Sequence, residues 1–90
     1  MGLFDFFKPK KTALEWAKEG ESYRLSKDFA KAINCFDKAL ELDSGLARAW
    51  LSKGLALGMM GKEKDALDSI QKAARMGDQK AMQFLQNGSL

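Results

Sequence analysis

The sequence contains no histidine, a single cysteine and a single proline among its 90 residues. Without histidine, the chain lacks the side chain that most often serves as a general base or metal ligand near neutral pH. Cys35 has neither a second cysteine with which to form a disulfide nor a histidine to lower the pKa of its thiol. We therefore expect no enzymatic activity, no metal and no cofactor. A single thiol without a disulfide partner is typical of a protein in a reducing compartment, and we take the cytoplasm as the default location.

Long apolar runs and a strong charge of one sign are also absent. No apolar run approaches the roughly 20 residues that a membrane-spanning helix needs. The net charge of +3 is too small to indicate nucleic-acid binding, because nucleic-acid binders usually concentrate basic residues in a stripe. Charged residues make up 30% of the chain and apolar residues 46%, which is typical of a soluble globular domain.

The dominant positive feature is a repeat with a period of 34 residues. A shift by this period aligns residues of similar size and polarity: Trp16 with Trp50, Gly20 with Gly54, Ala32 with Ala66, Phe36 with Ile70, and Ala39 with Ala73. A third copy begins with Phe84 and Gly88 before the sequence stops at Leu90. A fixed period of this length is typical of stacked arrays, in which each unit buries its apolar face against the next.

The residue types at the repeated positions predict pairs of closely packed helices. The glycine and alanine of each unit are small enough for two antiparallel helices to approach backbone to backbone. The aromatic and branched residues between them then fill the space around that crossing. Two such pairs followed by a last, single helix are expected.

These positions resemble the pattern of the tetratricopeptide repeat family, which places Trp, Leu-Gly, Tyr, Ala, Phe, Ala and Pro in that order. Residues 13–46 supply Trp16, Gly20, Tyr23, Ala32, Phe36 and Ala39, with Glu19 and Ser44 where Leu and Pro are usual. Residues 47–80 supply Trp50, Gly54, Ala66 and Ala73, and depart from the pattern at Lys53, Leu57, Ile70 and Asp78. The resemblance implies an all-α, right-handed α-solenoid of antiparallel helix pairs with about five helices.

The chain divides into an apolar and basic arm, residues 1–11, and a repeat domain, residues 12–90. The domain holds one repeat at 13–46, a second at 47–80 and a capping helix at 79–87. Thr12 and Glu15 form a capping-box pattern that predicts the first helix start, and Asp28 and Asp78 predict later ones. With these signals, the helices are expected at about 12–25, 29–42, 46–60, 62–76 and 79–86.

The resemblance also implies that the first helix of each unit lines a concave groove that binds a peptide or protein segment. It places ten residues there: Leu14, Ala17, Glu21, Arg24, Arg48, Leu51, Leu55, Met59, Met82 and Leu85. Burial under neighbouring helices is the alternative for Leu51 and Leu55. Some family members grip a terminal carboxylate with Lys and Asn, but Ala17 and Glu21 stand at those positions here. An apolar or amphipathic peptide therefore suits the groove better.

The arm leaves several alternatives open. It carries an apolar cluster followed by a basic residue: Leu3, Phe4, Phe6, Phe7 and Lys8. These residues suit a peripheral membrane anchor, a cover for the first repeat, insertion into the groove of a second copy, or a frayed terminus. Two repeats are also fewer than the roughly three that such arrays usually need, so a homo-oligomer is a further alternative. The rival function is therefore a self-assembling or membrane-tethered structural component.

Overall fold

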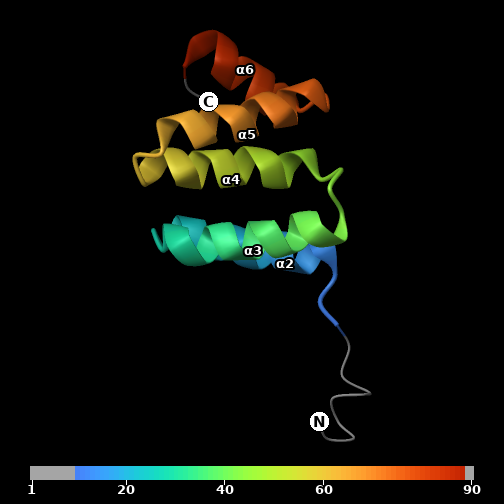
Figure 1. Ribbon diagram of the computed structural model, residues 1–90. Coiled ribbons are helices and arrows are strands. Elements are labelled where there is room, and N and C mark those ends of the chain that lie inside the picture. Colours follow the sequence, from blue (N-terminus) through green and yellow to red (C-terminus); the bar gives the residue numbers. More distant parts are fainter. Residues whose placement is uncertain (1–9, 89–90) are drawn as a thin grey trace, which may run out of the picture.

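The computed structural model describes residues 10–88, which form five α-helices and no strand (Figure 1). The helices are α2 (Ala13–Leu25), α3 (Phe29–Leu42), α4 (Ala47–Met59), α5 (Glu63–Arg75) and α6 (Gln79–Asn87). The predicted all-α helical-repeat fold is confirmed, and each helix end lies within one residue of its expected position. The predictions on Leu3, Phe4, Phe6, Phe7 and Lys8 fall outside the described residues.

Local capping explains where three of the helices begin. The Thr12 hydroxyl accepts the Glu15 N–H at 3.2 Å while the Glu15 carboxylate accepts the Thr12 N–H at 2.9 Å, which completes the predicted capping box. Asp28 and Asp78 accept backbone N–H groups in the first turns of α3 and α6. These bonds satisfy N–H groups that have no partner within the helix, and so they fix the starts of the helices.

The turn inside each repeat uses a left-handed backbone position. Gly61, between α4 and α5, has φ +81°, a region that glycine enters without steric cost. Lys27 occupies the equivalent position 34 residues earlier and has φ +66°. The turn geometry is therefore kept in both units, although only the second unit has the residue best suited to it.

The helices stack as two antiparallel pairs, α2 with α3 and α4 with α5, and α3 packs against α4 to join the pairs (Figure 1). The single helix α6 packs on α5 at the opposite end of the stack from α2. Two apolar clusters form the core, one of Ala32, Phe36, Leu40 and Ala49, and one of Leu51, Ile70, Ala73 and Ala81. Trp50 is half-buried and packs against both clusters, so it links the two units.

The repeated glycines occupy close contacts between paired helices. A Cβ atom on Gly54 would lie 2.9 Å from the backbone oxygen of Ala66 and 2.6 Å from a side-chain carbon of Ile70. In the second unit the glycine and alanine therefore bring the backbones together as expected. In the first unit, the nearest atoms to a Cβ on Gly20 would be those of the Phe36 ring, at 2.7 Å. The larger aromatic residue thus occupies the space beside Gly20.

Candidate functional site

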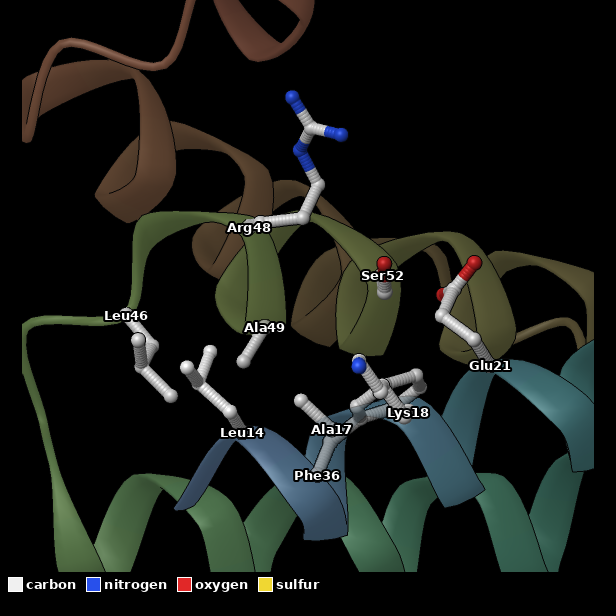
Figure 2. Close-up of a pocket in the computed structure, with 9 residues that line it drawn as sticks. All are labelled: Leu14, Ala17, Lys18, Glu21, Phe36, Leu46, Arg48, Ala49 and Ser52. Carbon is white, nitrogen blue, oxygen red and sulfur yellow. The ribbon is translucent and has the colours of Figure 1, made fainter. Parts of the chain in front are cut away.

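A cavity of about 290 Å³ lies between α2 and the first half of α4, with Phe36 of α3 at its base (Figure 2). We call it the first pocket. Its lining residues come from three helices and the turn before α4: Leu14, Ala17, Lys18, Glu21, Phe36, Leu46, Arg48, Ala49 and Ser52. Figure 2 shows Leu14 and Ala17 directed toward Leu46 and Ala49 across the cavity. Helices from two successive repeats therefore enclose one largely apolar space.

The carboxylate of Glu21 is held at one side of the first pocket by Arg24. The Arg24 guanidinium donates two hydrogen bonds to it, at 3.0 and 2.8 Å. The bond from Arg24 lowers the pKa of Glu21, with a smaller contribution from Ser52, and the same bond raises the pKa of Arg24. Glu21 is therefore ionised near neutral pH, and its charge is compensated within its own helix.

Arg48 ties the first pocket to the start of α6. Its Nε donates a hydrogen bond to the Asp78 carboxylate at 3.1 Å, and the same carboxylate accepts the Ala81 N–H at 2.9 Å. The Arg48 side chain is 61% exposed, and Figure 2 shows its guanidinium pointing away from the apolar base of the pocket. The Arg48 guanidinium therefore lies at the rim rather than inside the cavity, and its charge is compensated by Asp78.

A second cavity, of about 380 Å³, lies where the end of α4 meets the start of α5. We call it the second pocket. Apolar side chains and two glycines make up most of its lining, with one carboxylate: Gly54, Leu55, Gly58, Met59, Glu63, Ala66, Leu67, Ile70 and Phe84. Met59 and Leu67 are 66% and 46% exposed, so much of their apolar surface faces solvent. The second pocket is thus an open apolar surface bordered by Glu63.

The structure brings six of the ten predicted groove residues to these two pockets. Leu14, Ala17, Glu21 and Arg48 line the first pocket, and Leu55 and Met59 line the second. Arg24, Met82 and Leu85 lie outside both pockets. The last two are each 39% exposed on α6.

Leu51 is the clear exception among the predicted groove residues. Its side chain is only 1% exposed and belongs to the cluster with Ile70, Ala73 and Ala81. The alternative of burial therefore applies to Leu51, which is a core residue and not a contact residue. Leu55 is half-buried and still lines the second pocket.

The sequence prediction missed several lining residues, of which Lys18 and Ser52 had a detectable signal. Lys18 comes four residues after Leu14, and Ser52 four residues after Arg48, so each lies one helical turn along the predicted face. Leu46, Ala49 and Phe36 had no such signal, because their contribution depends on how the helices cross.

Other kinds of site find little support within residues 10–88. Within that range no group of three or more potential metal-ligating side chains comes together. The Cys35 thiol is buried, and burial raises its pKa, which disfavours the reactive thiolate. None of the described helices is both long and apolar enough to cross a membrane.

Antiparallel helix pairs stacked with a fixed period define the helical-repeat, or α-solenoid, class of proteins. More specifically, the chain belongs to the tetratricopeptide repeat family: residues 13–46 match the family model described as "Tetratricopeptide repeat", and α4 and α5 repeat the same helix pair. The resemblance noted in the sequence is thereby confirmed. Repeats of this family form protein–protein interaction modules.

Curated relatives agree with this assignment. The chain is 33% identical over 64 residues to the protein "Protein STIP1 homolog" of Dictyostelium discoideum, covering 71% of this chain and 11% of that protein. It is 27% identical over 86 residues to "DnaJ homolog subfamily C member 7" of Homo sapiens, covering 96% of this chain and 17% of that protein. The Mus musculus protein of the same name is 27% identical over 79 residues, covering 88% of this chain and 16% of that protein. The chain thus spans only a small fraction of the length of these relatives.

Proposed function

We propose that the chain is a non-catalytic adaptor that binds a peptide or protein segment in the groove between α2 and α4. The first pocket is the observation that carries this proposal. It presents an apolar cavity of about 290 Å³ between helices of two successive repeats, and charged side chains stand at its rim. An apolar cavity with a few polar groups around it is the usual form of a binding site.

The chemistry of the pocket favours an apolar or amphipathic segment. Filling it with a side chain of the size of Leu contributes roughly 1.5 to 3 kcal/mol through removal of apolar surface from water. The carboxylate-gripping mode of other family members is disfavoured, because Ala17 offers no charge and Glu21 is itself a carboxylate. Glu21 also has its charge compensated by Arg24.

The test compares two exposed leucines. Leu14 is 61% exposed and lines the first pocket, whereas Leu42 is 60% exposed at the end of α3 and lies outside both pockets. Peptides selected from a random library on the wild-type chain are titrated into Leu14→Gln and Leu42→Gln by fluorescence anisotropy. We expect Leu14→Gln to raise Kd about tenfold, equivalent to a loss of about 1.4 kcal/mol, and Leu42→Gln to leave Kd unchanged.

Circular dichroism provides the folding control for both variants, since a change at either exposed leucine should leave the helix content intact. Equal Kd values for Leu14→Gln and Leu42→Gln, with both variants folded, would contradict binding in the first pocket.

The rival function, a self-assembling or membrane-tethered component, depends on the arm and therefore on residues outside the described range. A chain starting at Lys11 separates the two functions. An adaptor keeps its peptide affinity after this truncation, whereas a tether loses pelleting with anionic liposomes and an assembly loses its oligomer in sedimentation equilibrium. We keep the cytoplasm as the proposed compartment, since the single thiol, Cys35, is buried and has no second cysteine to pair with.

A further inference from the structure

The two pockets meet along one face of α4. Arg48, Ser52, Leu55 and Met59 follow one another at intervals of four, three and four residues, so their side chains lie on one side of the helix. Arg48 and Ser52 line the first pocket, whereas Leu55 and Met59 line the second. A single segment that lies along this face of α4 therefore passes over both cavities.

We propose that one amphipathic helix of a partner protein occupies both pockets and inserts one apolar side chain into each. This inference rests on the proposed function and specifies its ligand. Arg48 and Leu55 are seven residues apart, as are Ser52 and Met59, which corresponds to about 10 Å along a helix axis. A partner helix with two apolar residues about seven positions apart presents them on one face at the same spacing.

The charges around the pockets fix the direction of the bound helix. Three charged side chains border the first pocket, but Arg48 is paired with Asp78 and Glu21 with Arg24, which leaves the positive charge of Lys18 without an ion pair among residues 10–88. Glu63 is the charged residue that borders the second pocket. The rim thus changes from positive to negative along α4. The complementary partner carries a carboxylate beside its first apolar residue and a Lys or Arg beside its second.

The same charge pattern also stabilises the helical conformation of the partner segment. Acidic residues near the N-terminus and basic residues near the C-terminus of a helix interact favourably with its dipole. The partner therefore lies with its N-terminus at the first pocket and runs in the same direction as α4.

The arm of the chain itself fits this surface less well. Its apolar cluster is followed by Lys8, and Lys10 and Lys11 come next, so its charge has the same sign as Lys18 and Arg48. Lys11 pairs with Glu19 and lies 4.3 Å from the centre of the Trp16 ring, and none of these three residues lines the first pocket. The charge of the arm therefore favours a segment of another protein as the occupant.

The probe is a synthetic helical peptide of alanine and glutamine with two Leu residues about seven positions apart, Glu beside the first and Lys beside the second. Its matched control has the same composition with the two Leu residues about three positions apart, which shortens their separation to roughly 5 Å. Anisotropy titration with the full-length chain should give a Kd about tenfold lower for the long spacing. Exchanging the Glu and Lys positions should weaken binding severalfold at low salt, with the difference disappearing at high salt.

Two variants of the protein locate the second contact. Met59 is 66% exposed in the second pocket, whereas Met76, 41% exposed at the end of α5, lies outside both pockets. We expect Met59→Gln to raise the Kd of the long-spacing peptide about tenfold and to leave the short-spacing peptide unaffected. Met76→Gln should change neither Kd.

The outcomes separate this inference from the proposed function. If Leu14→Gln weakens binding while Met59→Gln and the Leu spacing have no effect, the first pocket binds peptides and the two-pocket ligand is wrong. If Leu14→Gln also has no effect, the proposed function fails as well. If the chain starting at Lys11 binds the long-spacing peptide much more tightly than the full-length chain, the arm occupies the groove, and its assignment to a partner helix is overturned.

Discussion

Gly54 lies at a close contact between α4 and α5, and an added methyl group there has no room. Its Cβ would lie 2.6 Å from Ile70 and 2.9 Å from the Ala66 backbone oxygen, which cannot move without shifting α5. Gly54→Ala should therefore lower the free energy of unfolding by about 1 to 3 kcal/mol, the usual cost of overpacking, although alanine favours helix by about 1 kcal/mol. Urea unfolding followed by circular dichroism measures the change.

Gly58, on the same helix, is the control for this prediction. A Cβ atom there would lie 3.7 Å from the Ala66 methyl group, an ordinary contact distance. Gly58→Ala should consequently stabilise the chain by up to about 1 kcal/mol through helix propensity alone. Stabilisation by both substitutions would show that the helices do not approach closely at Gly54.

At the same residue scale, the sequence predicted which small residues lie at helix contacts better than it predicted which atoms lie beside them. The 34-residue period identified Gly20 and Gly54 correctly as contact positions. It could not distinguish the Phe36 ring beside Gly20 from the backbone approach beside Gly54. That difference depends on the residue at one repeated position, Phe36 in the first unit and Ile70 in the second, and on how each side chain packs.

At the scale of the element, Asp78 determines how α6 begins. Burial of this carboxylate opposes its ionisation, but the bonds from the Ala81 N–H and from Arg48 together outweigh that effect and lower its pKa. Asp78→Ala should cost about 1 kcal/mol of stability at neutral pH, as for other aspartate caps. Asp78→Asn should cost less, because an asparagine side chain can still accept the Ala81 N–H.

The lowered pKa also gives this contribution a definite pH dependence. Asp78 binds a proton less readily in the folded chain than in the unfolded chain, where its pKa is near the ordinary 3.8. Its contribution is therefore fully present above that pH and is lost as the pH falls through the folded-state pKa. The difference in unfolding free energy between wild type and Asp78→Asn should shrink on acidification below pH 3.8. A difference that stays constant down to low pH would contradict the lowered pKa.

The boundaries of the helices were the most predictable features of the fold, because they depend on local chemistry. Thr12, Asp28 and Asp78 bond to backbone groups within three residues, so the sequence contains all the information that these caps need. The pockets depend on which side of α4 its neighbours cover. Leu51 and Leu55 are equally apolar, yet α5 and α6 bury the first and leave the second half-exposed.

At the scale of the whole molecule, stability depends on coupling between neighbouring units, as in other repeat proteins. Trp50 contributes to this coupling because it packs against both core clusters. Its indole N–H also donates to the Ser44 carbonyl oxygen in the turn between the units, at 3.1 Å. Trp16, at the equivalent repeat position, belongs to neither of those clusters and has the Lys11 ammonium 4.3 Å from its ring.

The two tryptophans therefore predict different consequences for cooperativity. Trp50→Ala should lower the free energy of unfolding by about 3 kcal/mol and reduce the apparent urea m-value, because the two helix pairs no longer unfold together. Trp16→Ala should cost less and leave the m-value near that of the wild type, since it removes contacts at one end of the stack only.

Circular dichroism with amide hydrogen exchange resolves the two cases. In Trp50→Ala the amides of α3 and α5 should lose their common opening free energy, whereas in Trp16→Ala they should keep it. Equal m-values and a shared opening free energy in both variants would mean that the α3–α4 contact couples the repeats without Trp50.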